Sequence, residues 1–175
     1  GSGLVGSEMC IRDRLWQDAR RKAQETLDNY WDHSYPVKIV SICKAMGVTP
    51  YTGELPEGVS GMIVKEHSSE PRAYTERTEP QTRRRFTLAH ELGHFVERVT
   101  IAQDNDFAFM DKRSDDYDIH EFYADEFAGA LLMPEHDFIQ KVKNDGMIAA
   151  AAYFGVSLAA VRKRMERLRK HGADI

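Results

Sequence analysis

The chain has 175 residues, with 24 Lys and Arg against 28 Asp and Glu, which gives a formal charge of -4. This balance excludes a protein that coats nucleic acid through positive charge. Because 42% of the residues are hydrophobic, the chain can bury one core, which excludes disorder throughout. Two cysteines, Cys10 and Cys43, are too few for a disulfide framework, and the longest apolar run, residues 147–156, is much shorter than the roughly 18 residues of a membrane span. We therefore expect a cytoplasmic domain without a membrane segment.

The predicted elements begin after residues 1–10, which we expect to be a flexible or artificially added leader. Residues 11–175 should form a single domain. Apolar residues recur at helical spacing from Arg14 to Tyr30, and Trp16 should dock this helix on the domain. A second helix should begin near Pro36 and end at Gly47.

The middle of the chain predicts a loop, two strands and then more helix. Glycines and prolines indicate a loop over residues 51–61, and short strands should follow at residues 62–64 and 73–75. Helical spacing then returns in three segments: residues 83–99, residues 118–133 before Pro134, and the tail from Phe138. We therefore predict an α+β domain that is mostly helical and has one small sheet.

The strongest chemical signal is an HExxH sequence that runs from His90 to His94. Residues four apart lie on one face of a helix, so both imidazoles can reach one Zn²⁺ ion. Glu91 lies about 100° around the helix, where it could take a proton from metal-bound water. Gly93 has no side chain and should let another element approach the metal closely. The composition predicts only roughly 0.02 chance occurrences of this pattern, which favours a metal site over two surface histidines.

A catalytic zinc site normally has three protein ligands and one water, so the next helix should supply a third ligand. Glu121 and Asp125 share one helical face amid core residues, where two acids without partners would be costly. We predict that Glu121 binds the metal and that Asp125 accepts the ring N–H of a ligand histidine. His120 remains an alternative ligand, or else a surface histidine at a helix start, and we expect Glu126 to be solvated.

These two blocks resemble the ImmA/IrrE family of bacterial and phage zinc metallopeptidases, which are compact relatives of the thermolysin-like enzymes. The matching blocks are residues 83–94 and 121–134, and the flanking segments 36–48 and 155–168 are also similar. The resemblance implies a zincin-like fold and the cleavage of a helix-turn-helix transcriptional repressor in a phage, mobile-element or stress-response switch. It assigns the same site residues: His90, His94 and Glu121 as zinc ligands, Glu91 as general base and Asp125 as support for a ligand histidine.

The chain departs from the family pattern at two places. Family members often end the strand before the first block with Asn, whereas this chain has Glu76 after Thr75, which changes the expected substrate contacts along that strand. The family's usual Asn at the position of Asp125 is an Asp here, and a carboxylate is the stronger acceptor for a histidine N–H.

The implied reaction is hydrolysis of a peptide bond. Zinc would polarise the scissile carbonyl and activate a water, and Glu91 would pass the water's proton to the leaving amine. The group that stabilises the oxyanion is left open among four residues: Tyr74, Arg113, Tyr123 and His136.

The C-terminal segment, residues 147–170, has the spacing of a helix-turn-helix, with Ser157 as helix N-cap. Residues 156–175 carry a net charge of +4, which leaves -8 for the rest of the chain. Six basic residues could contact DNA phosphates: Arg162, Lys163, Arg164, Arg167, Arg169 and Lys170.

We favour the other interpretation of this segment, an amphipathic helix that packs Leu158, Val161, Met165 and Leu168 on the peptidase core. The alternative function is a non-catalytic regulatory or antitoxin-like module that binds DNA through this segment and keeps zinc as a structural element. A structural zinc would need four protein ligands, and the sequence offers three and a base, which favours the enzyme. The substrate, the activating signal and the oligomeric state stay open.

Overall fold

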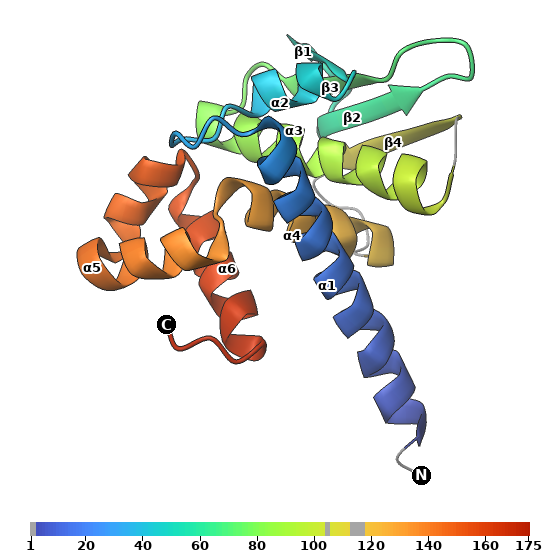
Figure 1. The fold of residues 1–175 in the computed structure, drawn as a ribbon. Coiled ribbons are helices and arrows are strands. Elements are labelled where there is room, and N and C mark those ends of the chain that lie inside the picture. Colours follow the sequence, from blue (N-terminus) through green and yellow to red (C-terminus); the bar gives the residue numbers. More distant parts are fainter. Residues whose placement is uncertain (1–2, 104–105, 113–117) are drawn as a thin grey trace.

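The computed structural model describes residues 3–103, 106–112 and 118–175 and confirms an α+β fold with a small sheet beside a larger helical part (Figure 1). The helices are α1 (Gly3–Tyr30), α2 (Ile39–Ala45), α3 (Gln81–Val96), α4 (Ile119–Leu132), α5 (Glu135–Phe154) and α6 (Leu158–Lys170), and a short π-helix, η1 (Glu97–Ile101), follows α3. The strands are β1 (Thr49–Gly53), β2 (Val59–Lys65), β3 (Arg72–Glu76) and β4 (Phe107–Lys112). Within the described ranges, no helix is both long and apolar enough to cross a membrane.

The sheet has the strand order β1-β3-β2-β4. Strand β1 runs parallel to β3, and β2 runs antiparallel to β3 and β4. The two predicted strands are confirmed as β2 and β3. The other two strands, β1 and β4, lie at the edges of the sheet. Strand β1 falls partly within the segment predicted as a loop. The loop prediction relied on glycines and prolines, but an edge strand can contain a proline and can leave a side chain such as Tyr51 exposed.

Helix α1 closes one side of the core. Its buried residues recur at helical spacing and pack against α4: Trp16, Ala19, Ala23 and Leu27. The docking of Trp16 is therefore confirmed, and the ring of His171 stacks on its indole at a centroid distance of 3.5 Å. The helix begins at Gly3, so most of the segment predicted as a leader has a helical backbone, and in Figure 1 this end of α1 extends away from the rest of the molecule.

Helices α3 and α4 lie side by side, and α3 also packs on β2 and β3. Helix α4 approaches α3 closely at Gly93, where a Cβ atom would lie only 3.0 Å from the Cα of Ala124. That this glycine lets an element approach the metal stays a prediction. Two prediction boundaries shift. Helix α2 begins at Ile39 rather than near Pro36, and Pro134 both follows α4 and precedes the first residue of α5.

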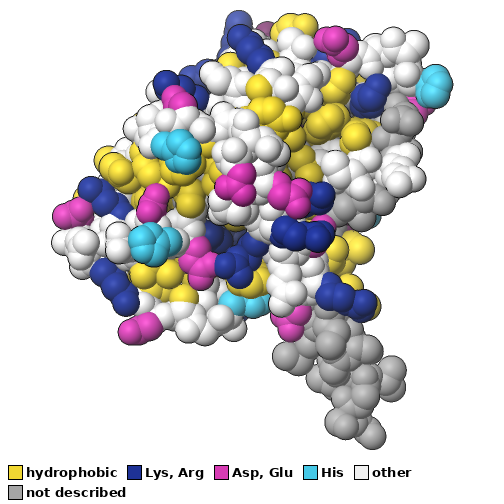
Figure 2. All heavy atoms as spheres, viewed as in Figure 1, with side chains coloured by type: hydrophobic (Ala, Val, Ile, Leu, Met, Phe, Trp, Pro, Cys, Tyr) yellow, Lys and Arg dark blue, Asp and Glu magenta, His cyan; other side chains and the backbone are white. Residues whose placement is uncertain are grey.

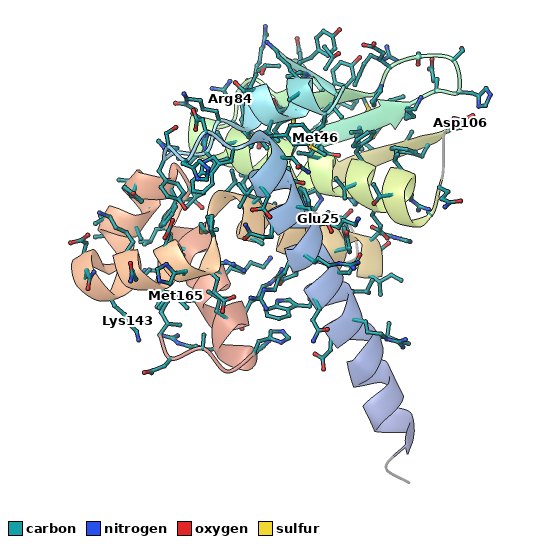
Figure 3. All side chains as sticks on the ribbon, in the orientation of Figure 1. Glu25, Met46, Arg84, Asp106, Lys143 and Met165 are labelled. Atoms are coloured by element: carbon teal, nitrogen blue, oxygen red, sulfur yellow. The ribbon has the colours of Figure 1, made fainter. Side chains whose placement is uncertain are left out.

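The C-terminal helices meet at a tight turn in which Gly155 has a φ of 66°. Ser157 caps α6 as predicted, since its Oγ accepts the N–H of Ala160 at 3.1 Å. Val161, Met165 and Leu168 are buried in the common core, and Figure 3 labels Met165 among the side chains that fill this region. The packing interpretation of this helix is therefore the one that the structure supports.

Candidate metal centre

Two histidines from α3 and one carboxylate from α4 converge on a single point. The ligand atoms of His90, His94 and Glu121 all lie within 4.8 Å of one another. Glu121 bridges the pair, with its two oxygens 3.1 Å from His90 Nε2 and 3.0 Å from His94 Nε2. Both histidines are buried, so this cluster is held in one geometry by the packing of α3 on α4.

The start of α4 fixes the position of Glu121. Asp118 is the N-cap of this helix, and its side chain accepts the backbone N–H groups of His120 and Glu121, both at 2.9 Å. Such a cap holds the first turn of α4 in helical form, so that the Glu121 side chain projects from an ordered helix end toward α3. Glu121 therefore faces the two histidines from a rigid helix end and not from a loop.

The donor set of this cluster fits zinc. Two imidazole nitrogens and one carboxylate oxygen are a common ligand set of catalytic zinc sites, in which a water takes the fourth position. Calcium and magnesium prefer oxygen ligands, so they fit a site with two histidines poorly. The residues present are therefore suited to hold Zn²⁺.

Glu91 is fully buried between α3 and the central strand β2. A Cβ atom on Gly61 of β2 would lie 2.7 Å from Glu91 Oε1 and 2.4 Å from Thr87 Cγ2. The backbone of β2 therefore passes directly over the Glu91 carboxylate. Gly61 was predicted as the last residue of a loop, but it lies inside β2, where a glycine is a known sign of close backbone approach.

We predict that Gly61→Ala lowers the melting temperature by several degrees and impairs any reaction that depends on Glu91. The added methyl has no room, so Thr87 or Glu91 must move, and overpacking of this kind costs about 1–3 kcal/mol. Thermal unfolding followed by circular dichroism measures the effect. Gly53→Ala is the matched control, because a Cβ atom at Gly53 meets no atom within 4 Å. Equal melting temperatures for the two variants would contradict the proposed contact.

Asp125 lies one helical turn beyond Glu121 and contacts a predicted ligand. Its Oδ1 is 2.8 Å from His90 Nδ1, so with Nε2 directed to the metal cluster the Nδ1–H donates to the carboxylate. Burial alone would raise the pKa of Asp125, but the hydrogen bond from His90 and nearby positive charges lower this pKa to about 2. Asp125 therefore stays ionised and can hold His90 in one tautomer and orientation.

Helix α6 reaches this site from the other side. Lys163 Nζ and Arg167 Nη2 lie 3.5 and 3.7 Å from Asp125 Oδ2. Arg167 also forms an ion pair with Glu126, which is only 1% exposed. The prediction that Glu126 is solvated was therefore wrong, and the physical reason is that α6 packs over this face of α4 and brings a guanidinium to it.

We predict that Arg167→Leu lowers the free energy of unfolding by about 3 kcal/mol, because it leaves the buried Glu126 carboxylate without its cation. Urea denaturation measures this change. The double variant Arg167→Leu/Glu126→Leu should regain most of the lost stability, since an apolar pair can replace a buried ion pair. Arg162→Leu, an exposed change on the same helix, should alter stability by less than about 0.5 kcal/mol. A loss in Arg167→Leu no larger than in this control would refute the interpretation.

Three of the four residues left open as oxyanion-stabilising groups lie in the described ranges, and their side chains contact residues that are not metal ligands. Tyr123 is buried and its hydroxyl is 3.3 Å from Asp18, while His136 is largely exposed beside Asp137. Tyr74 stacks on another tyrosine at a centroid distance of 5.3 Å. Arg113 lies outside the described residues. His120, the alternative ligand, pairs through Nδ1 with Glu97 at 2.6 Å and does not join the metal cluster.

Comparison with known proteins gives a family match and several similar solved structures. Residues 61–166 match the family model described as Peptidase_M78, IrrE N-terminal-like domain. A solved structure, a Mycobacterium tuberculosis transcriptional regulator, superposes with a TM-score of 0.63 at 16% sequence identity, over 89% of this chain and 50% of that chain. This chain thus spans about half the length of that regulator, and at such low identity the likeness concerns the fold alone. No curated protein matches the sequence.

Proposed function

We propose that this chain, which belongs to the Peptidase_M78 family of the IrrE N-terminal-like domain, is a zinc-dependent endopeptidase. The family match confirms the resemblance to the ImmA/IrrE metallopeptidases. The observation that carries the proposal is the convergence of His90, His94 and Glu121 beside the buried carboxylate of Glu91. A purely structural zinc site would need a fourth protein ligand, and the described residues supply three to this cluster.

In this proposal His90, His94 and Glu121 hold the metal, and Asp125 orients His90 through the hydrogen bond to Nδ1. A bound zinc ion supplies a Lewis acid that polarises the scissile carbonyl and makes a bound water acidic. The protein keeps the three ligands in place before substrate arrives, because they project from two packed helices.

Glu91 acts as the general base. It lies next to the first ligand on α3, and the burial of its carboxylate beneath β2 keeps competing bulk water away. Glu91 accepts the proton of the attacking water and delivers it to the nitrogen of the leaving amine. Both transfers use one carboxylate, so the net charge of the site is unchanged after a complete turnover.

The substrate that we propose is a helix-turn-helix transcriptional repressor in the cytoplasm, by analogy with the ImmA/IrrE family. The test is co-expression with candidate helix-turn-helix repressors from the same genome, followed by mass spectrometry of repressor fragments. Fragments should form with the parent chain and be absent with Glu91→Gln. Glu166→Gln is the matched control, because it makes the same chemical change at an exposed carboxylate, and it should cleave like the parent. Cleavage that persists in Glu91→Gln would exclude this chain as the peptidase.

The DNA-binding alternative is weakened by the orientation of α6. Arg164 and Arg167 are turned toward the protein, which leaves four exposed basic side chains: Arg162, Lys163, Arg169 and Lys170. We predict that duplex DNA of varied sequence binds only weakly and without sequence preference, because the rest of the chain is acidic. Fluorescence anisotropy at low and physiological salt measures this. Tight DNA binding would reverse our preference if the slope of log affinity against log salt concentration became shallower by roughly 0.9 for each exposed Lys or Arg removed.

A further inference from the structure

Arg164 is a buried cation for which the described residues provide no counter-ion. It is only 3% exposed, its Nε donates to the backbone oxygen of Met133 at 3.2 Å, and no acceptor within the described ranges contacts its buried Nη1. Burial lowers the pKa of Arg164 to about 10, and the carboxylates of Glu126 and Glu135 oppose this effect from a distance. The guanidinium therefore remains charged at neutral pH, although burial of an unpaired charge is unfavourable.

Arg164 lines a pocket of about 310 Å³ between α1 and the α4–α5–α6 region. The polar residues around this pocket come from three helices: Gln17, Arg20, Arg21 and Gln24 from α1, Glu135 from α5 and Arg164 from α6. Three guanidinium groups and one carboxylate give the lining a formal charge of +2. Figure 2 shows Lys and Arg side chains gathered in the hollow where α1 passes the C-terminal helices.

The neighbouring arginines are already held in place by acids. Arg20 pairs with Glu135 and lies over the ring of Trp16, with its Cζ 4.2 Å from the centroid, and Arg21 pairs with Asp18. Each guanidinium has five N–H donors, so such a pair leaves donors available to a ligand. The pocket thus has two preorganised cations at its rim and one buried cation without an ion-pair partner in the described part of the chain.

We propose that this pocket binds the phosphate group of a small molecule, with Arg164 as the inner contact and Arg20 and Arg21 at the rim. The planar guanidinium fork binds phosphate oxygens in a bidentate manner, and a charge of +2 matches a phosphate dianion better than a single carboxylate. The volume lies at the lower end of the range for small-molecule sites. This pocket contains none of the residues of the metal cluster, so the inference does not depend on the proposed function.

A bound water is a weaker explanation of how the buried guanidinium of Arg164 is stabilised. Its side chain also borders a cavity of about 30 Å³ beside Glu126 and Asp125, which is the size of one water molecule. A water there would accept a hydrogen bond but would add no negative charge. It would also give no reason for the two further arginines of the larger pocket.

The test is thermal unfolding of the full chain in inorganic phosphate and in sodium chloride of equal ionic strength. Phosphate should raise the melting temperature by about 3–5 °C more than chloride at a tenfold excess over its dissociation constant. Arg164→Met should lose this phosphate-specific rise and should be at least as stable as the parent in chloride, because the change removes a buried charge. Arg162→Met, which removes an exposed arginine of the same helix, should keep the rise.

Calorimetric titration then gives the affinity, and Arg21→Met offers a second variant at a largely exposed side chain that does not threaten folding. The Arg21→Met change should weaken phosphate binding about tenfold.

Glycerol 3-phosphate should bind at least as tightly as inorganic phosphate if the natural ligand is a phosphate ester, and tighter binding of inorganic phosphate would identify the free ion instead. Equal binding of acetate, no phosphate-specific rise in the parent, or the same rise in Arg164→Met and Arg162→Met would overturn the proposal. Because both variants keep the metal cluster, phosphate bound to a metal ion cannot mimic the expected difference.

Discussion

Glu91→Gln is expected to abolish measurable peptide hydrolysis while zinc content and melting temperature stay close to those of the parent. The amide keeps the shape of the side chain, which is fully buried under β2, but it cannot accept a proton from water. Loss of a general base typically costs about 10²–10⁴-fold in rate. The rate at which the proposed repressor substrate is cleaved under single-turnover conditions, with equal amounts of zinc-loaded protein, measures this loss.

The comparison needs a check that Glu91→Gln is folded and loaded with metal. Elemental analysis and circular dichroism give that check, and Glu166→Gln shows the effect of the same substitution on an exposed side chain. A folded, zinc-loaded Glu91→Gln protein that cleaves at the parental rate would contradict the role of Glu91 and with it the proposed mechanism.

His94→Ala should reduce the zinc content from about one ion per chain to less than about a tenth of that value, because two of three ligands cannot retain the ion through purification. The side chain is fully buried, with Nε2 3.0 Å from Glu121, and no other imidazole can take its place within the described cluster. Glu121→Ala should also weaken zinc binding. Asp125→Asn should lower zinc affinity by about 10–100-fold, since it removes the charged acceptor of His90.

Two histidines outside the cluster serve as controls. His67 is exposed, and His171 stacks on Trp16 away from the ligands, so His67→Ala and His171→Ala should retain the parental zinc content. Inductively coupled plasma mass spectrometry after gel filtration measures all variants in parallel. Unchanged zinc in both His94→Ala and Glu121→Ala would show that the metal site has been misassigned.

The parts of the site that sequence could predict depend on local periodicity. His90 and His94 are one turn apart on a single helix, so their common face follows from helix geometry alone. Glu121 was predicted because an acid on an apolar helical face needs a partner, and the structure brings it to the histidines. The α+β class followed in the same way from the spacing of apolar residues along each segment.

The features that sequence analysis missed depend on contacts between distant segments. Nothing in the order of residues around Glu126 shows that Arg167, on another helix, covers it. A glycine inside a strand indicates a close backbone approach, but only the structure shows that Thr87 and Glu91 lie against Gly61. Strand β1 contains a proline and leaves two of its five residues exposed, so it lacks the apolar alternation by which a half-buried strand is predicted. Strand β4 was missed although its first four residues are apolar.

The position of α1 affects how the protein can be divided for expression. The family match begins at residue 61, yet Trp16, Ala23 and Leu27 bury their side chains in the common core against α4, the helix that carries Glu121. A fragment cut at the start of the family match would expose this apolar face to solvent. We expect such a fragment to aggregate and a fragment that starts at residue 11 to remain monodisperse. We therefore expect the smallest autonomous unit to be larger than the segment that the family model matches.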